Sequence, residues 1–270
     1  LYGQIGSYKK SLEYTEKALT VAQEIGDRRG EGNALGNLGL TYGYLGEAEK
    51  AMAYYEQALE IARELGDRHG EGSALGNLGI AYRDLGEVEK AIVYHEQAIE
   101  IAREIGDRRG EENALGNLGI AYRDLGEVEK EREYYEQALK IARDIGDRRG
   151  EENALGNLGI AYRDLGEVEK EREYYEQALK IAREIGDRRG EGIWLNNLGV
   201  AFKDLKKYDV ALACYLLART IRGEIRGGEI EGTENNISAL KTKIGAEEFQ
   251  KLMAAVEPKA GEIIKSILGT

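Results

Sequence analysis

Apolar residues recur along most of the chain at the spacing of amphipathic α-helices. Within 27–66, a first run places Leu35, Leu38 and Tyr42 at positions i, i+3 and i+7. A second run follows Leu45-Gly46, and its members share one helical face: Ala51, Tyr55, Ala58, Leu59 and Ala62. This pattern predicts two helices, each with one apolar stripe that faces a core.

Glycine and aspartate mark the helix ends. Gly66 follows the second apolar run, and a glycine just past a helix end is a common stop because it accepts a positive φ. Asp67 comes next, where its carboxylate can cap the following helix. The same pair returns later in the chain as Gly106-Asp107, Gly146-Asp147 and Gly186-Asp187. Each unit is therefore predicted to be helix, tight turn, helix, tight turn.

This unit repeats with a period of 40 residues, at 27–66, 67–106, 107–146, 147–186 and 187–226, while residues 1–26 match the second half of one more unit. One helical hairpin cannot bury both of its faces, but stacked hairpins can. The sequence therefore predicts an all-α solenoid over residues 1–226, and it begins in the middle of a repeat.

The remaining stretch, 227–270, lacks the repeat but keeps helical apolar patterns. One face carries Ile230, Ile237, Leu240 and Ile244, and a short run follows before Pro258. Because the last repeat of a solenoid exposes an apolar face, we predict that 227–270 forms capping helices. The alternative is a helix that docks a partner.

The repeated residues resemble the signature of the tetratricopeptide repeat. Leu38-Gly39 and Tyr42 are followed by Ala51, Tyr55 and Ala58, and the pattern returns in register in later units. At 40 residues the unit exceeds the usual length of about 34. Long units of this kind resemble those of the Pins/LGN polarity adaptors and the kinesin light chain. The resemblance implies a right-handed superhelix of antiparallel helix pairs that binds protein partners along its concave side, which the first helices line.

Asparagines recur on these first helices, and we refer to them as the asparagine column. Its members are Asn33, Asn37, Asn77, Asn113, Asn117, Asn153, Asn157 and Asn197. Asparagine is a poor residue for the middle of a helix, yet its amide both donates and accepts hydrogen bonds, as a peptide backbone does. We therefore expect the column to bind an extended peptide. The alternative is that these amides bond within the solenoid and support the stack.

The column is similar to the asparagine ladder in the superhelix of O-GlcNAc transferase. Basic residues that clamp a C-terminal carboxylate in related domains are replaced here by Asn113, Asn153 and Ile193. The sequence thus favours an internal segment of the partner over a chain end.

Two units depart from the pattern. Glu131 and Glu171 stand where other units have alanine, and Arg132 and Arg172 follow them. A buried, unpaired carboxylate would be costly. We therefore expect the helix start to splay, or Glu and Arg to pair at the surface. The alternative is a second contact surface or an oligomer interface.

Composition narrows the function further. The net charge is −12 and the pI about 5.0, which disfavours nucleic acid as a partner. No apolar run is long enough for a membrane span, and the single Cys214 suits a reducing compartment such as the cytoplasm. His69 and His95 have no catalytic companions in sequence, and no ligand spacing suggests a metal.

These observations predict a cytoplasmic, non-enzymatic adaptor without cofactor, catalytic residue or metal, which binds a peptide segment of a protein partner. Two alternatives remain: a self-associating module, forming a homo-oligomer, and a regulatory arm of a larger protein.

Overall fold

A computed structural model describes residues 2–225 and 230–269 of the chain, and every regular element in these ranges is helical. The helices of the repeats are α1 (Tyr2–Ile25), α2 (Arg28–Tyr44), α3 (Ala48–Leu65), α4 (Arg68–Asp84), α5 (Val88–Ile105), α6 (Arg108–Asp124), α7 (Val128–Ile145), α8 (Arg148–Asp164), α9 (Val168–Ile185), α10 (Arg188–Asp204) and α11 (Tyr208–Glu224). The contacts group into two compact units, Leu1–Ile141 and Ala142–Thr270.

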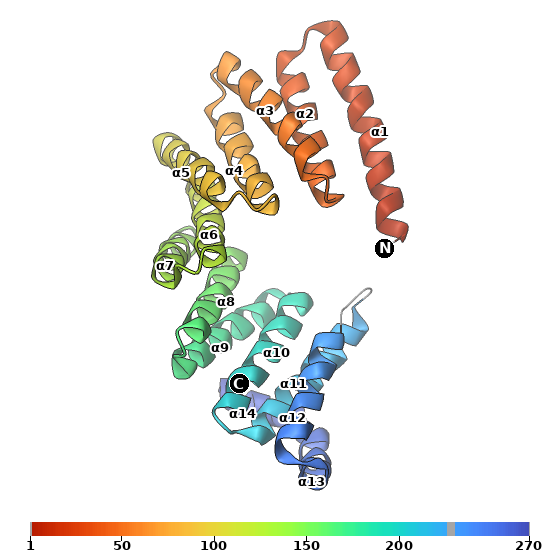
Figure 1. The fold of residues 1–270 in the computed structure, drawn as a ribbon, viewed down its shortest axis with the longest axis vertical. Coiled ribbons are helices and arrows are strands. Elements are labelled where there is room, and N and C mark those ends of the chain that lie inside the picture. The colour runs from red at the N-terminus through yellow and green to blue at the C-terminus, as the bar shows by residue number, and fades with distance from the viewer. Residues whose placement is uncertain (1, 226–229, 270) are drawn as a thin grey trace. The chain divides into compact units, whose positions relative to one another are not determined.

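Within each unit, consecutive helices pack against one another. In the first unit α2 packs on α3, α3 on α4, α4 on α5 and α5 on α6, and in the second unit the same holds from α8 to α11. Because two or three residues join neighbouring helices, successive helices run in opposite directions, as Figure 1 shows. The prediction of an all-α repeat solenoid is confirmed.

The predicted helix ends are also confirmed. Gly66 ends α3 with a φ of +66°, in the left-handed region that favours glycine. The Asp67 carboxylate then accepts a hydrogen bond of 2.9 Å from the backbone N–H of Gly70, which caps α4. The turn after α10 differs, because Lys206 takes the left-handed conformation with a φ of +60° where earlier turns have glycine. Lysine pays a steric penalty there.

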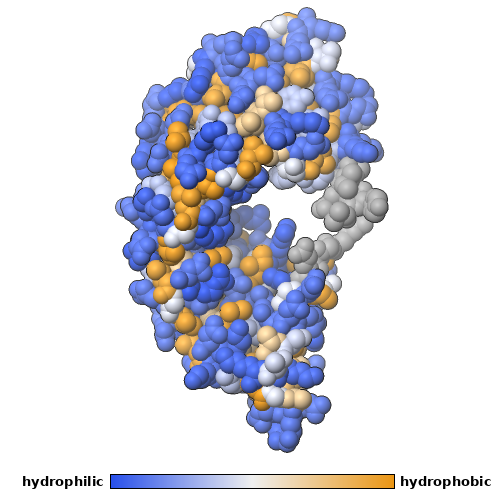
Figure 2. Space-filling view, viewed as in Figure 1, coloured by the Kyte–Doolittle hydropathy of each residue, from blue (hydrophilic) through white to orange (hydrophobic). Residues whose placement is uncertain are grey.

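The Leu-Gly signature creates the close contact within each helix pair. Leu38 is fully buried, and a Cβ added to Gly39 would lie 2.6 Å from the Tyr55 ring. The first and second helices of the pair therefore approach as closely as they do only because residue 39 has no side chain. The apolar stripes meet between the helices, and hydrophilic residues dominate the surface in view in Figure 2.

The repeated Arg and Glu residues link neighbouring repeats. The Glu71 carboxylate accepts hydrogen bonds from Arg63 at 2.9 Å and from Arg68, and Arg68 also pairs with Glu104 of the next second helix. Glu71 is buried, so this carboxylate is not a solvated surface group. Charge-assisted bonds of this kind satisfy a buried carboxylate and fix the stacking of one repeat on the next.

Beyond the repeats lie α12 (Glu231–Ile244), α13 (Ala246–Val256), η1 (Glu257–Lys259) and α14 (Ala260–Leu268). Both α12 and α14 pack on α11, with Leu240 and Ile264 buried. The proposed start of the capping region at 226/227 lies outside the described residues, so this boundary stays a prediction.

Candidate functional site

In the first unit, the asparagine column lies on the solvent-facing side of α2, α4 and α6. The side chains of Asn33, Asn37 and Asn113 are exposed, and those of Asn77 and Asn117 are half-buried. Their helix neighbours Leu38, Leu78 and Leu118 point into the core instead. The helical period thus separates the amides from the apolar stripe.

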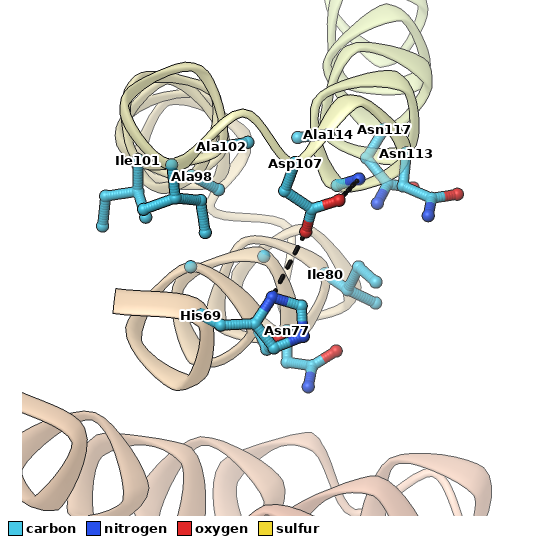
Figure 3. Close-up of a pocket in the computed structure, with 15 residues that line it drawn as sticks. His69, Asn77, Ile80, Ala98, Ile101, Ala102, Asp107, Asn113, Ala114 and Asn117 are labelled. Carbon is cyan, nitrogen blue, oxygen red and sulfur yellow. Dashed lines mark hydrogen bonds and ion pairs between the residues drawn. The ribbon is translucent and has the colours of Figure 1, made fainter. Parts of the chain in front are cut away.

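Asn77, Asn113 and Asn117 line one pocket of about 450 Å³ between α4, α5 and α6, which we call the α4–α6 pocket. Figure 3 shows the amides across the pocket from the apolar residues of α5. Its remaining lining residues are His69, Gly72, Ser73, Gly76, Ile80, Ala98, Ile101, Ala102, Ile105, Asp107, Gly110 and Ala114. An apolar floor with a few polar groups around it is typical of a binding site.

Three amides of the column have no hydrogen-bond partner within the described part of the solenoid. Among the described residues, none hydrogen-bonds to the side chains of Asn77, Asn117 or Asn157. Amides that supported the helix stack would have partners within it, because buried polar groups are usually satisfied. Their donors and acceptors therefore face the pocket or the solvent.

Several lining residues did not stand out in the sequence. Gly72 and Gly76 leave the wall of α4 bare, and a Cβ added to Gly76 would meet no atom within 4 Å. At the rim, His69 Nδ1 lies 3.3 Å from an Asp107 carboxylate oxygen. The sequence does hold one hint of this open wall. The next two repeats carry a glutamate, Glu112 and Glu152, at the position where this repeat has Gly72.

In the second unit, Asn153 is exposed on α8 while Asn157 and Asn197 are half-buried. Asn197 differs from the others because it lies beside the Tyr175 hydroxyl. Burial raises the pKa of Tyr175 well above its usual range, and the Asn197 amide opposes that shift. Asn197 thus lies next to a buried tyrosine of its own unit, and its role in peptide binding stays a prediction.

The place that lies open at Gly76 is filled at the equivalent position of the second unit. A Cβ added to Gly156 would meet the Trp194 indole at 2.0 Å. The indole also stacks on the Tyr175 ring with centroids 6.1 Å apart, and its Nε1 donates a hydrogen bond of 2.7 Å to the Glu152 carboxylate. Trp194 is 7% exposed, so it is part of the core.

The expectation for Glu131 and Glu171 is wrong. Their helices start at the regular position, Val128 and Val168, and the two side chains are 0% and 1% exposed. Each carboxylate therefore occupies the close contact that Ala91 makes in its own repeat. The apolar stripe further along the helix buries enough surface to hold this position inside.

Burial has an electrostatic consequence at Glu171. Neither of its carboxylate oxygens has a hydrogen-bond partner among the described residues. Loss of hydration raises the pKa of Glu171 to about 7, and Arg163 opposes this shift while Asp204 and Asp164 add to it. The carboxylates thus cannot supply the second contact surface that the sequence suggested as an alternative.

The arginines that follow are half-buried and paired on their own helices. Arg132 lies 3.5 Å from Glu136, and Arg172 lies 3.1 Å from Glu176. Of the four residues suggested for a second contact surface, only the side chains of Arg132 and Arg172 are partly exposed, so that surface stays a prediction for these two residues.

The other reactive side chains are packed in the core. His95 is fully buried, and burial lowers its pKa to about 4. Cys214 is buried as well, which raises the pKa of its thiol. Within the described ranges, no three His, Cys, Asp or Glu side chains are placed to hold a metal ion, and no helix is long and apolar enough to cross a membrane.

Solved structures share this fold at low sequence identity. BtubC (BKLC) from P. vanneervenii has a TM-score of 0.72 and 22% identity, over 80% of this chain and 91% of that one. RapI, solved in its apo form, has a TM-score of 0.73 and 18% identity, over 94% and 73%. A signal transduction ATPase with a tetratricopeptide repeat sensor, from Pyrococcus horikoshii, has 0.69 and 22%, over 97% and 42%. A search of curated proteins finds no match.

A family profile matches most of the chain. Residues 1–64, 70–144 and 150–224 match the profile described as tetratricopeptide repeat. Repeats of this kind are generally protein–protein interaction modules, and their fold is typically a non-enzymatic scaffold. The matched residues are those whose helix pairs, Leu-Gly contacts and capped turns are described above, and the chain belongs to the tetratricopeptide repeat family.

Proposed function

We propose that this protein is an adaptor that binds an extended peptide segment of a protein partner along the asparagine column. The observation that carries the proposal is the α4–α6 pocket, where the amides of Asn77 and Asn117 face the cavity without partners among the described residues. Unsatisfied donors and acceptors at a pocket wall are available to a ligand.

The spacing of the amides fits a peptide backbone. First helices of successive repeats in this packing lie roughly 10 Å apart. An extended chain advances about 3.3 Å per residue. One amide per repeat would therefore hold roughly every third residue of the ligand, whatever its side chains are.

The charges of the pocket favour an internal segment. No lysine or arginine is among the residues that line the α4–α6 pocket, so a C-terminal carboxylate would find no cation there. The proposal places the protein in the cytoplasm, where the buried thiol of Cys214 stays reduced.

The test is selection of a random peptide library displayed on phage, with the full chain as bait. The comparison variant is Asn77→Ala with Asn117→Ala, which removes two amides and keeps the helices. We expect peptides whose affinity falls at least tenfold on the variant, since each lost hydrogen bond contributes about 1 kcal/mol. If the selected peptides bind both proteins equally, and both proteins melt alike by circular dichroism, peptide binding along the asparagine column is ruled out.

Self-association is the second candidate, because apolar side chains lie exposed on α1. Tyr14, Val21 and Ile25 are 69%, 52% and 71% exposed. If this face joins copies of the chain, sedimentation velocity will show a mass that rises with concentration, and Val21→Glu will abolish the rise. A constant monomer mass would remove this candidate.

A further inference from the structure

The two units contain equivalent places on their first helices, one filled by a side chain and the other open. Gly156 on α8 and Trp194 on α10 are 38 residues apart, and so are Gly76 on α4 and Ala114 on α6. In the second unit the indole covers Gly156, with Tyr175 and Glu152 beside it, and we call this arrangement the indole slot.

In the first unit the equivalent slot is open because two side chains are smaller. Ala114 replaces the indole, and Gly72 replaces the carboxylate that accepts its hydrogen bond. Gly72 and Gly76 then line the α4–α6 pocket together with Ala114. The nearest atom to a Cβ at Gly72 is an Ile101 methyl at 3.2 Å, so α5 supplies the floor.

We propose that the α4–α6 pocket binds a planar aromatic side chain of the partner segment, in the way that Trp194 fills the indole slot of the second unit. The inference rests on the proposed peptide binding and names the residue type that anchors it. A cavity of about 450 Å³ lies within the range of roughly 300–1,000 Å³ that is usual for ligand sites.

The chemistry of the lining supports an aromatic ring. Bare glycine backbone on α4 lets a flat ring approach closely, as the backbone of Gly156 does for Trp194. The methyl groups of Ala98 and Ile101 offer an apolar face on the other side. Asn77 and Asn117 at the edge could accept a hydrogen bond from an indole N–H, in place of the Glu152 carboxylate of the indole slot.

The test uses 5-fluoroindole as the probe and fluorine NMR on the full chain. We expect saturable binding with a dissociation constant on the order of 1 mM, as for a small fragment in a preformed pocket. Ala114→Trp should close the pocket with the chain's own indole and weaken binding at least tenfold. Ala53→Trp, on the exposed face of α3, adds the same ring elsewhere and should leave binding unchanged.

A second variant guards against misfolding of the first. Gly76→Leu projects a side chain into the open space from the opposite wall and improves helix propensity, so its fold should survive. Gly76→Leu should weaken the binding of 5-fluoroindole as Ala114→Trp does. The inference is overturned if the unaltered chain does not bind 5-fluoroindole, or if both filled variants still bind it and melt normally.

The peptide selection separates this inference from the proposed function. Selected peptides should carry Trp, Tyr or Phe at one shared position and should lose affinity on Ala114→Trp. Peptides without such a residue, which depend on Asn77 and Asn117 but not on Ala114, would preserve the proposed function and overturn the aromatic anchor. Binding of 5-fluoroindole without any selected peptide would support an aromatic site in the α4–α6 pocket but overturn the proposed peptide binding.

Discussion

The repeat 67–106 and the repeat 147–186 share one backbone design but differ at the points where it is filled. Gly76 borders an open pocket, whereas Gly156 lies under the Trp194 indole. Ala91 makes a simple close contact, whereas Glu171 buries a carboxylate there. A few side-chain changes on an unaltered pair of helices therefore leave a pocket open in one repeat and fill the equivalent place in another.

The same pair of repeats differs in its buried ionisable groups. His95 occupies the site of Tyr175, and burial holds the pKa of His95 at about 4. Glu171, by contrast, has a pKa raised to about 7. Both groups are neutral between these two values, and His95 becomes charged as the pH falls below about 4, whereas Glu171 becomes charged as the pH rises above about 7.

Removal of the indole should have the largest effect. Trp194→Ala leaves a cavity in the second unit and removes the donor to the buried Glu152 carboxylate, so unfolding should become easier by about 3–5 kcal/mol. Urea unfolding followed by circular dichroism measures this change. Trp194→Phe keeps a ring over Gly156 and should lose less than half as much. A loss below about 1 kcal/mol for Trp194→Ala would show that the indole slot adds little to the core.

Replacement of Glu171 by alanine should restore in repeat 147–186 the close contact that Ala91 makes in repeat 67–106. Because the folded pKa of about 7 exceeds the unfolded value of 4.5, the folded state binds more protons between these values, and stability falls as the pH rises through this window. The shift corresponds to roughly 3 kcal/mol.

The measurement is the difference in unfolding free energy between Glu171→Ala and the unaltered chain, at pH 5 and at pH 8. Trp194 fluorescence follows the second unit, because it is the one tryptophan in the chain. The unfolding free energy of Glu171→Ala, relative to the unaltered chain, should be higher at pH 8 than at pH 5 by roughly 3 kcal/mol. The same difference at both pH values would contradict the buried carboxylate.

Substitution of His95 should produce the opposite slope in the first unit. Its folded pKa of about 4 lies below the unfolded value of 6.5, so the unfolded state binds more protons in this window and stability falls as the pH drops. The unfolding free energy of the unaltered chain should fall by roughly 3 kcal/mol between pH 7 and pH 4 because of His95, and His95→Phe should lack this loss. Urea unfolding at both pH values tests this, and equal losses in the variant and the unaltered chain would refute it.

Relief of the strained turn should have the smallest effect. Lys206 holds a φ of +60°, which glycine adopts without penalty at Gly166 in the preceding repeat. Lys206→Gly should stabilise the second unit by about 1 kcal/mol, and Gly166→Lys should cost a similar amount. Thermal melts of the two variants provide the comparison, and shifts of the same sign would contradict it.

Local chemistry explains why most of the fold could be predicted. A glycine stop, an aspartate cap and the helical spacing of leucines act within one or two turns, so each could be recognised without its neighbours. The positions of the asparagine column on an outer helical face follow from the same spacing. Its role in binding stays a prediction.

The errors concern residues whose surroundings come from other helices. Glu171 was expected near the surface, because its charge argued against burial, but the apolar face of the whole helix overrode one unfavourable residue. The α4–α6 pocket was not predicted either, because its walls belong to three helices and its existence depends on what Ala114 lacks.

The sequence by itself determined the helices, their ends and the repeat, because these depend on residues a few positions apart. Only the tertiary structure decided which asparagines share a pocket, which carboxylates are buried and which slot is filled. Those outcomes depend on contacts such as that between Gly156 and Trp194, 38 residues apart in the sequence, whose packing a linear pattern does not reveal.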